Sequence, residues 1–322
     1  LIFCTFLLQA LFLHSYSNPL HAEPIEEDEW EAAAPEPDNP KVNWLDSSHG
    51  YLTNQTQTLA NWMDSFFGDE NYDSEQAESI IRIRLEHDWN SDDGSSFSSK
   101  IRGRVHLPRL SKRLSLVFSG DEEENGNFDD LLPGQEEDDR IGLQLLERET
   151  SKSRLDYTLG WSNGHLRPGI KYRRQAALGE KTTFRFNERI QYEHEKNVYS
   201  RTNFRISRLL TSNGIMNWSS RLIYGERTQG VEWSTQLSLL NRYKVEDDRP
   251  IAVSYFVSAA GVTSPDSYTS VYSAGLVYRR QLFRDYLFME FEPSANYRKL
   301  EAYDNRELLW RAVLKLEIVF SK

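Results

Sequence analysis

Basic side chains recur two residues apart along this chain, and their type and spacing suit a specific chemistry. Guanidinium and ammonium groups hydrogen-bond to carboxylates and phosphates, and a spacing of two places them on one face of an extended strand. On the wall of a water-filled passage they would raise the local concentration of anions. The alternative is that they pair across strands, stiffening the wall or holding a plug, with Glu86, Asp88, Asp156 and Glu232 as partners. The twelve candidates are Arg82, Arg84, Lys100, Arg102, Arg104, Lys171, Arg173, Arg185, Arg189, Arg201, Arg205 and Arg221.

Motifs for catalysis, cofactors and metals are missing from the sequence. It contains no G-x-S-x-G, H-E-x-x-H or G-x-G-x-x-G pattern and no phosphate-binding P-loop, and Cys4 is its only cysteine. His165 follows the tight turn Ser162-Asn163-Gly164, and a lone histidine beside a serine in a hairpin favours an incidental position over an acid/base role. The run from Asp88 to Gly94 is similar to a calcium loop, but Ser99 stands where a bidentate glutamate is required, which favours a hairpin tip. We therefore expect no catalytic residue, no metal site and no cofactor.

The elements that must position the basic residues are β-strands, because apolar and polar residues alternate from about Ser79 to Phe320. In the last strand, the residues from Leu308 to Phe320 on one face are apolar, while Arg311, Lys315 and Glu317 lie on the other. The alternation predicts about fourteen antiparallel strands, with twelve to sixteen allowed. Mean hydropathy is −0.65, and no long uncharged apolar run follows the first twenty residues, which excludes a helical membrane protein. A soluble β-sandwich is the competing fold, but strands of ten or more residues with a charged face argue against it.

These features together resemble those of bacterial outer-membrane β-barrel proteins. Such proteins carry an export signal, strands that are apolar toward lipid and polar toward the lumen, and a last strand that ends on an aromatic residue. Ile318 and Phe320 match that assembly signal, and Ser321 and Lys322 follow it. The resemblance implies a location in the outer membrane of a Gram-negative bacterium. It also implies contact with membrane lipid, lipopolysaccharide and the barrel-assembly machinery, and no nucleic-acid partner is expected because the basic residues form no exposed patch.

The part of the chain before the alternating region divides by composition and charge. Residues 1–22 read as a signal peptide, and 23–43 as an acidic, disordered periplasmic tail. Residues 44–78 contain one short amphipathic helix, with Leu52, Leu59, Trp62, Met63, Phe66 and Phe67 at helical spacing. The helix is expected either to act as a plug or lie on the rim of the 79–322 barrel, or to stay undocked as a contact for periplasmic partners. Because residues 23–78 carry a net charge of −14 and the rest of the chain +3, the acidic segment could close a basic lumen.

The most direct functional expectation is a passive, porin-like pore or a structural membrane protein whose arginine-rich lumen favours small anionic solutes. The loop 121–139 holds ten acidic residues in nineteen and is expected to be a solvated outer loop, with divalent-cation bridging to lipopolysaccharide as its alternative. Two further classes stay open: a lipid-modifying enzyme of the outer membrane, and a closed barrel that serves as a docking or adhesion platform. The sequence specifies neither the solute nor the oligomeric state.

Overall fold

The computed structural model describes most of the alternating region and a few residues before it. Described are Leu59, Trp62, Met63 and Phe66, together with residues 79–107, 113–118, 141–150, 152–162, 164–179, 181–194, 197–228, 230–243 and 249–321. All of them belong to the compact unit Val42–Lys322. The expected signal peptide, acidic tail and acidic loop 121–139 lie outside the described residues.

The described region forms fourteen strands, as the alternation predicts, and consecutive strands pair antiparallel. In chain order they are β1 Ser79–Asn90, β2 Gly94–His106, β3 Leu114–Phe118, β4 Ile141–Glu149, β5 Ser153–Ser162, β6 His165–Ala177, β7 Thr182–Glu193, β8 Asn197–Thr211, β9 Gly214–Gly225, β10 Val231–Tyr243, β11 Ile251–Val262, β12 Tyr268–Gln281, β13 Leu287–Arg298 and β14 Glu307–Ser321.

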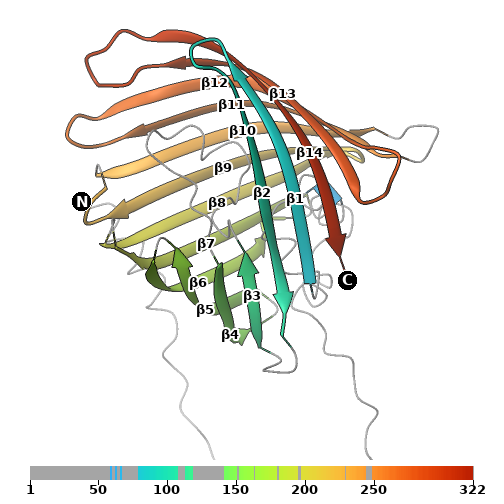
Figure 1. Ribbon diagram of the computed structural model, residues 1–322, viewed down its shortest axis with the longest axis vertical. Helices are drawn as coiled ribbons and strands as arrows, with labels where there is room; N and C mark the ends of the chain where they lie inside the picture. The colour runs from blue at the N-terminus through green and yellow to red at the C-terminus, as the bar shows by residue number, and fades with distance from the viewer. Residues whose placement is uncertain are drawn as a thin grey trace, which may run out of the picture. The chain divides into compact units, whose positions relative to one another are not determined.

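The sheet closes on itself because β1 pairs with β14 as well as with β2 (Figure 1). The pairing runs from Ile80 opposite Ser321 to Asn90 opposite Arg311. The start of β1 and the end of β14 therefore lie at the same end of the barrel, which we call the terminal rim. The opposite end, which carries the β1–β2 turn, is the far rim. Closure leaves no unpaired sheet edge between the first and last strands, which is what a strand-built membrane protein needs in hydrocarbon.

The wall of the barrel is apolar outside and polar inside. Large apolar side chains on one face of the strands are exposed, for example Ile101 at 56%, Trp161 at 50% and Tyr255 at 50%. On the other face charged side chains are buried, with Arg221 at 0% and Glu317 at 1%. This is the reverse of a soluble β-protein and fits a lipid-facing exterior. The predicted all-β transmembrane barrel is thus confirmed, and the β-sandwich is excluded.

Two strands differ from the expected length of ten or more residues. β3 has five residues and pairs with β2 only between Gly103 and His106, and β4 has nine. The alternation stops after Phe118, where Ser119, Gly120 and an acidic run follow in the sequence, so the pattern that supports a strand ends there. Among the described residues, no helix has the length and apolar character of a membrane span.

Candidate functional site

All twelve basic residues singled out from the sequence lie on strands, on the face opposite the exposed apolar side chains, and so point into the barrel. Their burial follows from that position. Arg82, Arg102 and Arg189 are each 6–7% exposed, and Lys171 is 3% exposed. The strand register divides the inward face into sectors of different charge pattern, which residue types alone do not reveal.

Positively charged side chains recur along the inward face of β6 to β9, which we call the basic sector. In its first row, Lys171 lies opposite Arg189, which lies opposite Arg201. Another row pairs Arg185 with Arg205. Directly opposed residues have Cβ atoms about 5 Å apart. The seven basic residues of this sector are Lys171, Arg173, Arg185, Arg189, Arg201, Arg205 and Arg221.

Carboxylates are scarce in the basic sector. On the inward face of the described β6 to β9 strands the single acidic residue is Glu193, which pairs with Arg167 at 2.8 Å near the far rim. The neighbouring strand β5 contributes Asp156, which accepts hydrogen bonds from Arg154 and Arg173, each at 2.9 Å. Asn203 accepts from Arg221 at 3.1 Å. The wall here is therefore a surface of cations and amides.

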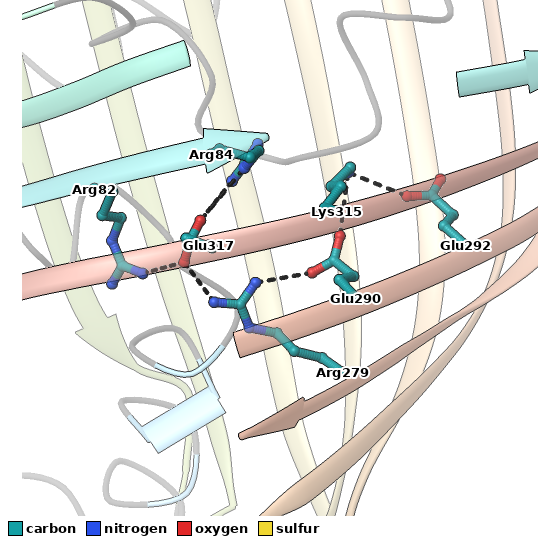
Figure 2. A network of polar contacts seen from close by, with 7 residues as sticks. All are labelled: Arg82, Arg84, Arg279, Glu290, Glu292, Lys315 and Glu317. Atoms are coloured by element: carbon teal, nitrogen blue, oxygen red, sulfur yellow. Dashed lines mark hydrogen bonds and ion pairs between the residues drawn. The ribbon is translucent and has the colours of Figure 1, made fainter. Parts of the chain in front are cut away.

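Strands β12, β13, β14 and β1 carry the opposite pattern, which we call the alternating sector; on its other side β1 places Arg82 opposite Arg102 and Arg84 opposite Lys100 of β2. One row runs Arg279, Glu290, Lys315 and Glu86 across β12, β13, β14 and β1, and each residue faces one of opposite charge. Opposed unlike charges stabilise a sheet, whereas like charges destabilise it. Figure 2 shows the resulting network of side chains pointing toward one another from four strands.

Glu317 is the hub of this network. Its carboxylate accepts from Arg82 at 2.7 Å, from Arg84 at 3.2 Å and from Arg279 at 2.5 Å. Arg279 also donates to Glu290 at 3.1 Å, and Lys315 bridges Glu290 at 3.1 Å and Glu292 at 3.4 Å (Figure 2). Nearer the far rim, Arg311 donates to Asp88 at 2.6 Å, again across the β1–β14 junction. Ion pairs thus tie the closing strands at two heights.

Sequence reasoning identified part of this partner set. Asp88 and Asp156 were expected as partners and form ion pairs, although the partner of Asp88 is Arg311 on the last strand. Glu290, Glu292 and Glu317 were not among the expected partners. The signal for them was present, because Glu290 and Glu292 alternate with Met289 and Phe291, and Glu317 alternates with Leu316 and Ile318.

Near the terminal rim the inward face becomes apolar, and a helical cluster packs there. Leu59, Trp62, Met63 and Phe66 are helical, and Leu59, Met63 and Phe66 are no more than 6% exposed. They pack against the wall residues Leu209, Ile215, Leu240, Ala252 and Phe288, which form the apolar seat. These come from β8 to β11 and β13.

Cation–aromatic contacts border the apolar seat. Phe66 stacks on Trp62 with ring centroids 4.7 Å apart and meets Phe288 edge-on at 5.6 Å. Arg242 lies 4.8 Å from the Trp62 ring, and Arg279 lies 4.8 Å from the Phe288 ring. Such contacts strengthen when desolvated. Arg279 therefore joins the helical cluster to the alternating sector.

At the far rim, the structure brings together two histidines. The rings of His165 and His194 stack with centroids 4.1 Å apart and an interplanar angle of 11°. Both are exposed. No group of three metal-ligating side chains occurs among the described residues. The turn after β1 is formed as expected of a hairpin tip, with the Asn90 side-chain oxygen accepting from the backbone of Asp92 and Asp93 and with Gly94 at φ +82°.

Comparisons with known proteins return structures but no family. No family model matches the chain, and no curated protein matches it. A KdgM porin solved in complex with disordered oligogalacturonate is 8% identical, with 74% of this chain and 99% of that chain covered and a TM-score of 0.36. A loop-deletion mutant of OmpT, an outer membrane protein of Vibrio cholerae, is 7% identical, with coverages of 76% and 99% and a TM-score of 0.46. OprB of Pseudomonas putida is 10% identical, with coverages of 81% and 98% and a TM-score of 0.44. These values identify no ligand or activity for this chain.

Proposed function

We propose that this chain is a passive pore of the bacterial outer membrane whose basic sector favours anionic solutes. The apolar exterior suits membrane lipid and lipopolysaccharide. The even number of strands places both ends of the barrel at the terminal rim, which in single-chain bacterial barrels faces the periplasm. In this orientation the N-terminal segment lies on the periplasmic side.

The observation that carries the proposal is the set of opposed like charges on β6 to β9. Lys171, Arg189 and Arg201 lie directly opposite one another, with Asp156 opposite Lys171 at the end of the row, and like charges across strands repel. Across β12, β13, β14 and β1 the same wall places unlike charges opposite one another, and opposed like charges recur between β1 and β2, at Arg82–Arg102 and Arg84–Lys100. A row of guanidinium groups is favoured where an anion can bridge them, since each can donate two hydrogen bonds to a carboxylate or phosphate.

The helical cluster narrows the passage at the terminal rim in this proposal. Its seat is apolar, whereas the wall between the seat and the far rim is charged. The apolar side chains of the cluster are therefore better accommodated against the seat than in water. A passage partly closed at one end and basic along one side would pass small anions in preference to large or cationic solutes.

One observation favours a second candidate, a closed barrel that acts as a docking or adhesion platform. The inward charged side chains of the alternating sector are almost fully buried, with Arg279 and Glu317 at 1% exposed. Side chains that fill a barrel interior leave no aqueous channel. Conductance separates this candidate from the pore, and analysis of lipid products on overexpression separates both from a lipid-modifying enzyme.

Ion selectivity in a planar bilayer tests the proposal. With a salt gradient across the bilayer, the wild type is expected to give a reversal potential of the sign for anion preference. Replacing Arg189 and Arg201 by Gln should move that potential toward zero and leave the barrel folded. Arg208→Gln is the matched control, because Arg208 lies on β8 like Arg201 but on the exposed outer face. Absence of any channel would exclude the pore, and equal shifts in the variant and the control would exclude the role of the basic sector.

A further inference from the structure

The lipid-facing wall carries one acidic residue at mid-height. Glu188 lies in the middle of β7, on the same face as Phe184, Phe186, Ile190 and Tyr192. Away from the strand ends, it is the only carboxylate on the outward face of the described strands. A carboxylate in the hydrocarbon region is destabilising, increasingly so toward the bilayer midplane. Its presence there calls for a physical reason.

Two hydroxyl groups of the neighbouring strand β8 hold this carboxylate. Thr202 lies directly opposite Glu188 and donates to its Oε2 at 2.6 Å, and Ser200 donates to Oε1. A carboxylate has about four acceptor positions, of which these two donors occupy two. The acceptor capacity that is left faces outward, where lipid tails offer no donor.

Hydroxyl groups continue around the wall from this point. On β9 and β10, Ser220 and Thr235 are hydrogen-bonded to each other at 2.7 Å, and the indole nitrogen of Trp218 donates to Thr235 at 2.9 Å. We call Glu188, Ser200, Thr202, Ser220 and Thr235 the polar strip. It runs across four adjacent strands, from a carboxylate at one end to hydroxyls at the other. Apart from Glu188 its members are small; Ser220 is 6% exposed, whereas the other four are partly exposed.

We propose that the polar strip is the contact surface between two copies of this chain in the membrane. Copies inserted in the same orientation carry their strips at the same height. A two-fold axis along the membrane normal, passing between β8 and β9, places β7 of one copy against β10 of the other. The Glu188 acceptor of each copy then meets the Thr235 hydroxyl of its partner, so the strip is complementary to itself.

In the dimer, the Glu188 carboxylate gains a hydrogen-bond donor that lipid does not provide in the monomer. A hydroxyl hydrogen atom rotates, so Thr235, which donates to the backbone oxygen of Ser219 at 3.3 Å, can instead donate to a partner carboxylate. Hydrogen bonds between membrane-spanning elements contribute only modest free energy each. The pair is therefore held by a few such bonds at each end of the strip. The basic sector lies on the other face of the same strands and takes no part in the contact.

The oligomeric state of the full chain in lipid nanodiscs, read by native mass spectrometry, tests the proposal. The wild type is expected to be a dimer, and Glu188→Leu a monomer with an unchanged β-sheet circular dichroism spectrum. Ser99→Leu is the matched control, because Ser99 is an exposed outward hydroxyl on β2, a strand outside the polar strip. This control should leave the dimer intact. A wild type that is monomeric, with or without a retained lipid, would overturn the proposal, as would a Glu188→Leu dimer.

Cysteine crosslinking gives a second readout, which does not depend on how tightly the two copies associate. In a Cys4→Ser background, Leu222→Cys should form a disulfide-linked dimer in the native membrane, because Leu222 is 37% exposed on the outward face of β9, beside the expected two-fold axis. Ser99→Cys should not. Equal crosslinking at both positions would indicate random collision and count against the interface.

Discussion

At the residue scale, the inward direction of the basic side chains follows from the period of two, but their partners do not. Glu317 binds Arg82 and Arg84, which are more than 230 positions away in the chain. Only the register of β1 against β14 brings them together. A sequence pattern gives the face on which a side chain lies, whereas the residue opposite depends on how the barrel closes. The partner carboxylates on β13 and β14 were missed for this reason.

Replacing Glu317 by Gln should destabilise the folded barrel by about 3 kcal/mol or more, because three guanidinium groups lose the charge that compensates them in a buried site. The amide keeps the size of the side chain, so the effect isolates the charge. The measurement is the denaturant midpoint of unfolding in detergent micelles, followed by tryptophan fluorescence.

Glu307→Gln provides the control for this change, since Glu307 lies on the same strand but is exposed at the far rim. Its midpoint is expected to match the wild type. If Glu317→Gln also matches the wild type, the network of Figure 2 does not stabilise the barrel.

At the element scale, helical spacing predicts that Leu59, Trp62, Met63 and Phe66 share one face, and the structure packs these four residues into one apolar cluster. Where that face packs could not be read from the sequence. The seat is assembled from single residues such as Leu209, Ile215 and Leu240, each of which stands next to an outward-facing apolar residue near a strand end. The surface becomes visible only when five strands are placed side by side.

The seat gives a prediction for the helical cluster. Phe288→Ala removes the ring that contacts Phe66 edge-on and carries the Arg279 guanidinium over its face. Large-to-small changes of this kind lower the free energy of unfolding by about 3 kcal/mol where the ring is well packed. With its seat weakened, the cluster should leave the passage more often, so planar-bilayer recordings should show a larger mean conductance or more frequent opening.

Phe291→Ala is the comparison variant, because Phe291 is on the same strand but faces outward and is 42% exposed. It removes the same ring without touching the seat. An identical conductance trace for Phe288→Ala, Phe291→Ala and the wild type would show that the cluster does not control the passage.

At the scale of the whole molecule, the architecture was the most predictable feature. Every membrane crossing needs one apolar and one polar face, so each strand repeats the same alternation, and fourteen repeats make the pattern hard to mistake. What fills the interior is less predictable, because it depends on the sum of inward side chains and on which segment enters. The division into a basic sector and an alternating sector likewise appears only once the ring of strands is ordered.

Deleting residues 23–78 while keeping residues 1–22 for export tests how the barrel and the N-terminal segment depend on each other. Closure uses β1 from Ser79 onward and β14, so the deleted chain is expected to fold into the same fourteen-stranded barrel. It loses the burial of Leu59, Met63 and Phe66 against the seat, about 1.5–3 kcal/mol for each side chain, and should unfold at lower denaturant concentration. It also loses the acidic residues that could enter the basic lumen, so its single-channel conductance should exceed that of the wild type. Unchanged conductance with lowered stability would show that the helical cluster stabilises the rim without closing the passage, and it would remove the plug from the proposed function.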